Sequence, residues 1–352
     1  MHTSMIVYRL FDVADEINLD LVQALWTSRN KIASRLRLDR VSTKSIAFKN
    51  PPVLVELGSH EMEFNGRQYL TEVKARIFDI GVISLILRIQ FDDDVTQEEY
   101  LDMAIESENM PEEKIREYLD AVLETISQAC VKQRVSDFEE DFVVYYFQNK
   151  LPDWDLVPLL LKDRTPVSSQ TRADTLANYF TYSDDITYLA WDSAIVYDKT
   201  GSLDIPDLLE FANAQFLELR YYDNALAQDI DKSYDELEEA SLVNKDNRQE
   251  TYRRIRGRLM EVMADISNIM GNINNALQVT EDIFYARVYT RYMELLKAAN
   301  WKETIDYKLN TIQRTYTLLN EEVSNYRLEK MGKTGIMLLV AILVTILLIF
   351  FK

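Results

Sequence analysis

Residues 335–351 read GIMLLVAILVTILLIFF, and Thr345 is the only polar side chain among them. Thirteen of these seventeen residues are Leu, Ile, Val or Phe. At about 1.5 Å per residue, a helix of this length measures roughly 26 Å, slightly less than the ~30 Å hydrocarbon core of a bilayer. The long side chains of the flanking Lys333 and Lys352 can cover the difference by snorkelling. The stretch therefore predicts a single membrane-spanning helix over residues 334–352.

The charges beside this helix predict its orientation. Arg327, Lys330 and Lys333 precede the apolar stretch, and Lys352 alone follows it. The side of a membrane that carries more Lys and Arg is the cytoplasmic one, so we expect residues 1–330 in the cytoplasm or in the equivalent inner compartment of an organelle. The N-terminal sequence MHTSMIVYRLFDVADEI lacks the pattern of a signal peptide. These features predict a tail-anchored, single-pass membrane protein whose interface residues are these four basic side chains.

Residues 203–330 follow a helical period. Three helices are expected, over about 204–240, 246–298 and 301–330, with turns near 242–245 and 299–301. The last of them repeats apolar residues at strict 4,3 spacing: Ile305, Leu309, Ile312, Tyr316, Leu319, Val323 and Tyr326. Strict heptads are typical of coiled-coil-like antiparallel packing. We expect this stripe to be a seam between copies in a homo-oligomer; burial against the other two helices of the same chain is the alternative.

Residues 1–200 predict an α+β domain. Asn65-Gly66 forms a strong hairpin signal, because both residues tolerate positive φ. Gly81 predicts a second turn, into an almost wholly apolar strand. The expected strands cover residues 6–11, 53–57, 61–64, 68–78, 82–91, 142–147 and 186–197, and the expected helices cover residues 19–26, 96–107 and 111–134. The fold class is thus an α+β domain over 1–200, long antiparallel helices over 203–330 and a membrane anchor over 334–352.

The sequence offers little for catalysis. Its 352 residues contain one Cys and two His, and no phosphate-binding glycine loop, nucleophile elbow or H-E-x-x-H motif. We expect Cys130 in the core, on one helix face with Ile115, Leu119, Val122 and Ile126, and His60 exposed. The run Asp92-Asp93-Asp94 either binds a divalent cation or lies beside the capped start of the helix that follows. We therefore expect a protein without enzymatic activity, cofactor or metal.

The charge is strongly negative. Residues 1–330 carry 37 basic and 58 acidic groups, so contact with RNA or anionic lipid requires a local basic patch. Segment 29–49 is one such patch. The other lies in the second long helix and contains Arg253, Arg254, Arg256 and Arg258. Internal pairing of these arginines with acidic side chains is the alternative.

The layout resembles two known families. Arg327-Leu328-Glu329 running into a terminal apolar helix, Gly81-Val82-Ile83 in a strand pair and Trp301-Lys302 opening the last helix are similar to the required-for-meiotic-nuclear-division family of tail-anchored proteins. That resemblance implies a membrane-attached, self-assembling, non-catalytic protein. We also expect a protein partner, which the sequence does not identify. The layout is also similar to CorA-type channels, which have two spans. We expect a tail-anchored scaffold, with a CorA-like ion channel or ion-sensing module as the alternative.

Overall fold

The computed structural model describes residues 3–28, 33–35, 50–64, 66–92, 95–107, 110–276 and 283–350. Asn65 of the expected turn, two residues of the acidic run 92–94, most of the basic segment 29–49 and Lys352 lie outside these ranges. The contacts within the chain divide it into two compact units. The first, here called the sheet unit, comprises Met1–Tyr221 and Gly271–Trp301, and the second, here called the helical unit, comprises Tyr222–Met270 and Lys302–Lys352.

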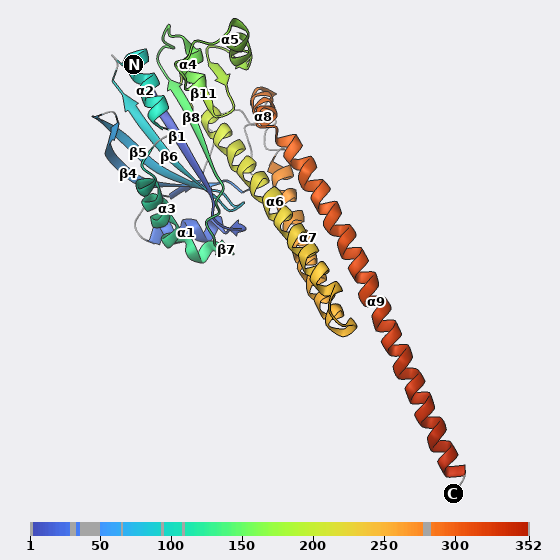
Figure 1. Ribbon diagram of the computed structural model, residues 1–352. Coiled ribbons are helices and arrows are strands. Elements are labelled where there is room, and N and C mark those ends of the chain that lie inside the picture. The colour runs from blue at the N-terminus through green and yellow to red at the C-terminus, as the bar shows by residue number, and fades with distance from the viewer. Residues whose placement is uncertain are drawn as a thin grey trace. The chain divides into compact units, whose positions relative to one another are not determined.

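The sheet unit is built on nine strands in the order β3-β4-β5-β6-β1-β8-β11-β10-β9 (Figure 1). Their bounds are β1 Thr3–Asp12, β3 Ala33–Arg35, β4 Val53–Phe64, β5 Arg67–Ile77, β6 Val82–Phe91, β8 Glu139–Phe147, β9 Tyr179–Phe180, β10 Ile186–Leu189 and β11 Ser193–Tyr197. All neighbours pair antiparallel except β8 and β11. Every residue of the central strand β1 is buried, as a strand covered on both faces requires.

One face of the sheet is covered by short helices. These are α1 (Leu19–Ser28), α2 (Gln97–Glu106) and α3 (Glu112–Ile126), and their apolar sides join Met5, Val7 and Phe11 of β1 in the core. Trp26 of α1 is completely buried there. Thr96 and Glu99 cap each other's backbone at the start of α2, so the sequence after the acidic run opens a helix as expected.

The other face of the sheet is covered by the first part of α6 (Asp204–Ser241). Arg76 of β5 binds Asp207 of α6, and Phe78 packs 6.1 Å from Phe211 between ring centroids. Helix α8 (Ile283–Leu295) joins this layer, because the Tyr285 hydroxyl donates to Asp204 at 2.7 Å. Two further short helices, α4 (Leu156–Leu161) and α5 (Ser169–Leu176), and the strand pair β2 (Glu16–Ile17) with β7 (Cys130–Val131) complete the unit.

The helical unit combines three helices. They are the second part of α6, α7 (Lys245–Ala276) and α9 (Ala298–Phe350). The Lys308 ammonium lies 2.7 Å from Asp223 of α6, and Arg256 of α7 donates to Asn320 at 3.0 Å. α9 is one unbroken helix that runs through the bundle into the apolar stretch, because its two glycines lie in ordinary helical geometry with open space around them.

The predicted class, an α+β domain followed by long helices and an apolar C-terminal helix, is confirmed. The unit boundaries differ from the expected ones: the first turns of α6, up to Tyr221, and all of α8 belong to the sheet unit. The predicted helix over 246–298 is α7 and α8 with residues 277–282 between them. The turn before α9 lies at Leu296–Lys297, where Lys297 has φ 53°, rather than at 299–301.

Three local expectations were wrong. The predicted strand over 186–197 is a hairpin, because the chain turns at residues 190–192 between β10 and β11. Strands 53–57 and 61–64 form a single strand, β4, with an irregularity between Glu56 and Gly58. The helix predicted over 111–134 ends at Ile126, so Cys130 lies in β7, half-buried and paired with Ile17, and not on the helix face.

The turn predicted at Gly81 is confirmed, with a physical reason for glycine. Its φ is +99°, a conformation that side chains with a Cβ rarely adopt. A Cβ there would lie 1.9 Å from the carbonyl oxygen of Ala14. The same approach lets Val13 donate its N–H to the Gly81 carbonyl at 2.9 Å. Glycine thus brings the β5–β6 turn against the chain that leaves β1.

Candidate functional site

The apolar end of α9 is the feature with the clearest functional chemistry. All residues from Arg327 to Phe350 are exposed, including ten consecutive apolar or small residues before Thr345 and five apolar residues after it. The Thr345 hydroxyl donates to the Ala341 carbonyl at 2.8 Å, so the one polar side chain in the stretch is satisfied within the helix. α9 is long and apolar enough to cross a membrane. A helix with no unsatisfied polar group and no polar face suits hydrocarbon better than water.

The predicted interface residues lie where this apolar end begins. Arg327, Lys330 and Lys333 are all exposed on α9, while Lys352 lies outside the described ranges. The Lys333 ammonium lies 2.8 Å from Glu329, and the Lys245 ammonium lies 2.5 Å from the same carboxylate. Hydrogen bonds from these two lysines lower the pKa of Glu329 to about 2. The carboxylate therefore stays ionised and links the start of α7 to the part of α9 just before the apolar stretch.

The stripe predicted as an oligomer seam is largely buried within one copy. Ile305, Ile312, Leu319 and Val323 are at most 6% exposed, and Leu309, Tyr316 and Tyr326 are half-buried. Ile312 lines a small hollow with Ile230 of α6 and Leu259 of α7. The 4,3 spacing is thus explained by packing of α9 on its own bundle. Self-association through this stripe remains a prediction.

The four arginines of the predicted basic surface do not form one free patch. Arg258 lies 2.8 Å from Glu236 of α6, and Arg256 donates to Asn320. Arg254 lies 4.0 Å from Glu236, with two thirds of its side chain exposed. Arg253 is exposed. Internal contacts therefore engage Arg256 and Arg258 most fully.

A first buried ionic cluster, which the sequence reasoning missed, joins the sheet to α6. Arg76 is 4% exposed, and its guanidinium binds Asp207 at 2.9 Å and the fully buried carboxylate of Glu210. One guanidinium neutralises one carboxylate, so the second is uncompensated. Burial, more than the neighbouring Asp207 charge, raises the pKa of Glu210 to about 7 although Arg76 opposes this. The sequence offered a partial signal, because Glu210 is flanked in the chain by Leu208, Leu209, Phe211 and Ala212, which are all buried.

A second cluster lies at the end of β1. Arg134 binds Asp12 at 2.9 Å and also Asp15, and its guanidinium carbon lies 4.2 Å from the centre of the Tyr221 ring. Burial raises the pKa of Asp12 to about 6, against the lowering effect of Arg134. Glu218 of α6 is fully buried, and neither of its carboxyl oxygens has a hydrogen-bond partner among the described residues. Burial, with the Asp12 charge adding to it, raises the pKa of Glu218 well above its usual range.

In the two clusters, buried acids with raised pKa values lie between the sheet and α6, and the ion pairs of Arg76 attach α6 to the sheet. In the ranges that the structure describes, no group of three or more His, Cys, Asp or Glu side chains is placed to hold a metal ion. His60 is exposed on β4, with its ring 5.7 Å from that of Tyr118. We assign the two clusters a structural role.

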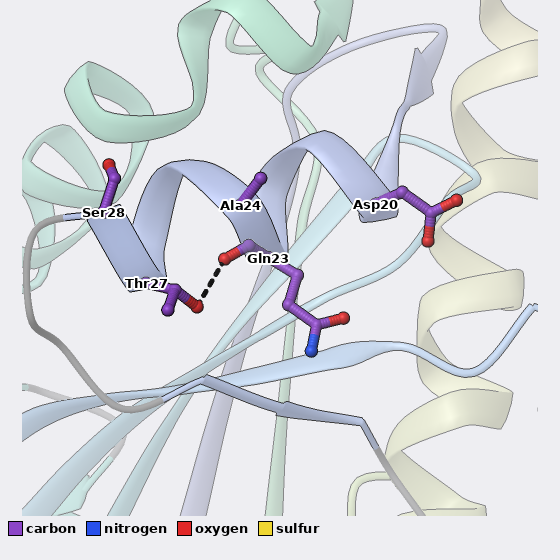
Figure 2. A pocket seen from close by; sticks show the side chains of 5 residues that line it. All are labelled: Asp20, Gln23, Ala24, Thr27 and Ser28. Carbon is purple, nitrogen blue, oxygen red and sulfur yellow. Dashed lines mark hydrogen bonds between the residues drawn. The ribbon is translucent and has the colours of Figure 1, made fainter.

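A shallow hollow lies on the polar side of α1. It is lined by Asp20, Gln23, Ala24, Thr27 and Ser28, all from this one helix (Figure 2). The Thr27 hydroxyl donates to the Gln23 carbonyl, an ordinary contact within a helix. Ser28 is the last described residue before 29–32, and we assign no ligand to this surface.

Comparison with known proteins identifies the first part of the chain. Residues 2–203 match a family model described as "Uncharacterized protein MJ0711, N-terminal domain". The chain is also 23% identical over 210 residues to that uncharacterized protein of Methanocaldococcus jannaschii, a match that covers 55% of this chain and 62% of the relative. No solved structure matches. The meiotic-division resemblance finds no support in these matches. The matched residues end where α6 begins, so the long helices lie outside the family model. Through this domain, the chain belongs to the MJ0711 N-terminal domain family.

Proposed function

We propose that the chain is a tail-anchored membrane protein, a non-catalytic scaffold whose sheet domain is carried on a helical bundle in the cytoplasm or an equivalent inner compartment. One observation carries this proposal. α9 continues without a break from a bundle where its stripe is buried into a segment where every side chain is exposed and apolar or small.

The energetics support the anchor. Leu, Ile, Val and Phe each gain about 0.3–0.6 kcal/mol at the centre of a membrane helix, so thirteen of them gain at most roughly 4–8 kcal/mol. In water the same side chains stay hydrated, because residues 336–350 are all exposed in the structure. The basic residues Arg327, Lys330 and Lys333 support the orientation, since they precede the apolar stretch in the chain.

The anchor can be tested by charges placed at matched positions of one helix. Leu343 and Leu347 lie in the apolar end, and Leu318 and Leu328 lie on the exposed side of α9 before it. The double variant Leu343→Arg, Leu347→Arg should lose about 6–8 kcal/mol of insertion free energy, which is as large as the whole gain. We expect it in the soluble fraction after cell lysis, while Leu318→Arg, Leu328→Arg stays with carbonate-washed membranes. Equal partition of the two variants would refute the anchor.

Orientation and release need a second pair of measurements. An N-terminal tag on the full chain should be sheltered from protease in intact cells. Deletion of residues 331–352 should release the remaining chain from membranes. Membrane retention of that truncated chain would show that another element provides the attachment.

The remaining parts of the proposal are self-association and a protein partner. The anchor confines copies to two dimensions, which raises their effective concentration. The mass of the full chain in detergent, measured by light scattering, decides between a monomer and a homo-oligomer. The channel-like alternative fits less well, because in the described part of the chain a single helix qualifies as a span, whereas CorA-type channels use two. RNA or anionic-lipid binding by Arg253 and Arg254 would show as salt-sensitive association.

A further inference from the structure

The turn between α6 and α7 carries two exposed aliphatic side chains. α6 ends at Ser241 and α7 begins at Lys245, and the residues between them include Leu242, 83% exposed, and Val243, 41% exposed. Turns between helices are usually polar, since they face water. Two neighbouring aliphatic residues exposed at the tip of a helical hairpin therefore suggest that an apolar surface outside this chain covers them.

The contacts of the helical unit place this tip along α9. Asp223 of α6 pairs with Lys308, so α6 begins its course through this unit beside the early turns of α9. α7 runs the opposite way: Arg256 contacts Asn320, and Lys245 contacts Glu329. The start of α7 is fixed a second time, because the Tyr326 hydroxyl donates to Asp246. The hairpin thus points its tip toward the C-terminal end of α9.

The distance from this tip to the apolar segment is short. Glu329 lies six residues before Gly335, which is about 9 Å along an α-helix. Leu242 and Val243 precede Lys245 in the direction of that segment, so they lie level with the turn of α9 that holds Lys330 and Lys333. Met331, in the same turn, is 65% exposed. Apolar and basic side chains therefore meet at one level, as they do at the interface of a bilayer.

The backbone carbonyls at the tip already have hydrogen-bond donors within the protein, so the tip can leave water at a lower cost. The Arg248 guanidinium donates to three carbonyl oxygens at the end of α6: Ala240 at 3.2 Å, Ser241 at 3.3 Å and Val243 at 3.4 Å. Unsatisfied carbonyls are costly to remove from water, and at the end of a helix they usually bind solvent. Arg248 satisfies them with protein donors and holds the turn in one shape.

We propose that the α6–α7 tip is a second membrane contact, in which Leu242 and Val243 insert into the interfacial layer of the bilayer that the C-terminal helix crosses. Headgroup phosphates are the complementary charges for Lys330 and Lys333 at the same level. Each copy then holds the membrane at two points, the span and the tip. The inference rests on the proposed anchor, which supplies the bilayer at this level.

The test measures depth in a bilayer, residue by residue, in the full chain. Cys130→Ser removes the native thiol, and Leu242→Cys, Met260→Cys or Leu343→Cys then provides a single site for an environment-sensitive fluorophore. Met260 is the matched control, because it is on α7, 57% exposed, and eighteen residues beyond Leu242. The labelled chains are reconstituted into vesicles of phosphatidylcholine and phosphatidylglycerol that contain nitroxide lipids with shallow or deep spin labels.

We expect blue-shifted emission at position 242 with strong quenching by shallow nitroxides, quenching by deep nitroxides at 343, and neither effect at 260. Quenching at 343 without quenching at 242 overturns the tip contact and leaves the anchor standing. No quenching at either position overturns the proposed anchor itself. A blue shift at 242 that persists in detergent and is insensitive to nitroxide lipids assigns the tip to a protein partner and overturns the inference.

Discussion

The two units bury very different surfaces with helices of the same chain. In the sheet unit, α6 is buried against the sheet through Glu210, Asn213 and Glu218, each at most 2% exposed. In the helical unit, α9 is buried through an apolar stripe that includes Ile312 and Leu319. The first surface buries charged and polar side chains, among them the ion pair of Arg76 with Glu210, beside apolar ones such as Leu209, whereas the stripe of the second surface is almost entirely apolar. The two should therefore respond differently to substitution and to pH.

Loss of the buried guanidinium should produce the largest effect. In Arg76→Met, the carboxylates of Asp207 and Glu210 lose their shared counter-charge, which typically costs about 3–5 kcal/mol in buried pairs. Urea unfolding of the full chain in detergent micelles measures this. Tryptophan fluorescence is the specific probe, because all four tryptophans lie in the sheet unit: Trp26, Trp154, Trp191 and Trp301.

The matched control is the exposed pair of Arg67 with Glu99 on the same sheet unit. The Arg67 side chain is 64% exposed, and Arg67→Met should leave the unfolding midpoint close to that of the unmodified chain. Equal shifts for Arg67→Met and Arg76→Met would contradict the role of burial in this comparison.

The stability of the helical unit should fall when one side chain on the buried side of α9 is truncated, and it should not when one on the exposed side is truncated. Leu319 is 4% exposed and Leu318 is 64% exposed, so these adjacent leucines differ in burial and little else. Leu319→Ala should cost about 3 kcal/mol through lost burial and a residual cavity, and Leu318→Ala less than about 0.5 kcal/mol. Far-ultraviolet circular dichroism of the full chain in detergent should show earlier loss of helix for Leu319→Ala. Similar transitions for both variants would place the stripe outside a packed core.

The comparison also explains what the sequence could predict. The apolar end of α9 and its stripe were visible because apolar residues recur at a fixed period, and Gly81 was visible because a turn there needs positive φ. The clusters around Arg76 and Arg134 were not visible, because Arg76 is 131 residues from Asp207 and Arg134 is 119 residues from Asp15, and a lone charged residue carries no period. The stripe predicted that one side of α9 packs on other helices, but it did not identify those helices. The same heptad pattern is found whether the partner helix belongs to the same chain or to another copy.

The smallest predicted effect concerns the pH dependence of the sheet unit. Burial raises the pKa of Asp12 to about 6, whereas an ordinary aspartate in the unfolded chain titrates near 3.8. Between these values the folded state binds the proton more tightly than the unfolded state. The contribution of Asp12 therefore makes the free energy of unfolding largest below pH 3.8. This free energy falls by roughly 2–3 kcal/mol as the pH rises to about 6. Asp12→Asn removes this titration, so its stability should change less between pH 4 and pH 6 than that of the unmodified chain.

Urea unfolding followed by tryptophan fluorescence at several pH values checks this slope. Asp20→Asn is the control, because the Asp20 side chain is 95% exposed and its loss should leave the slope unchanged. Asp15, Glu218 and Arg134 act on Asp12 or are acted on by it, and all three are present in both chains, so the difference between the two slopes isolates Asp12. A slope in Asp12→Asn equal to that of the unmodified chain would mean that Asp12 is ionised throughout this range. In that case, the lowering effect of the Arg134 guanidinium on the pKa of Asp12 would outweigh the raising effect of burial. Asp12 and Arg134 would then form a buried pair in which both side chains are charged.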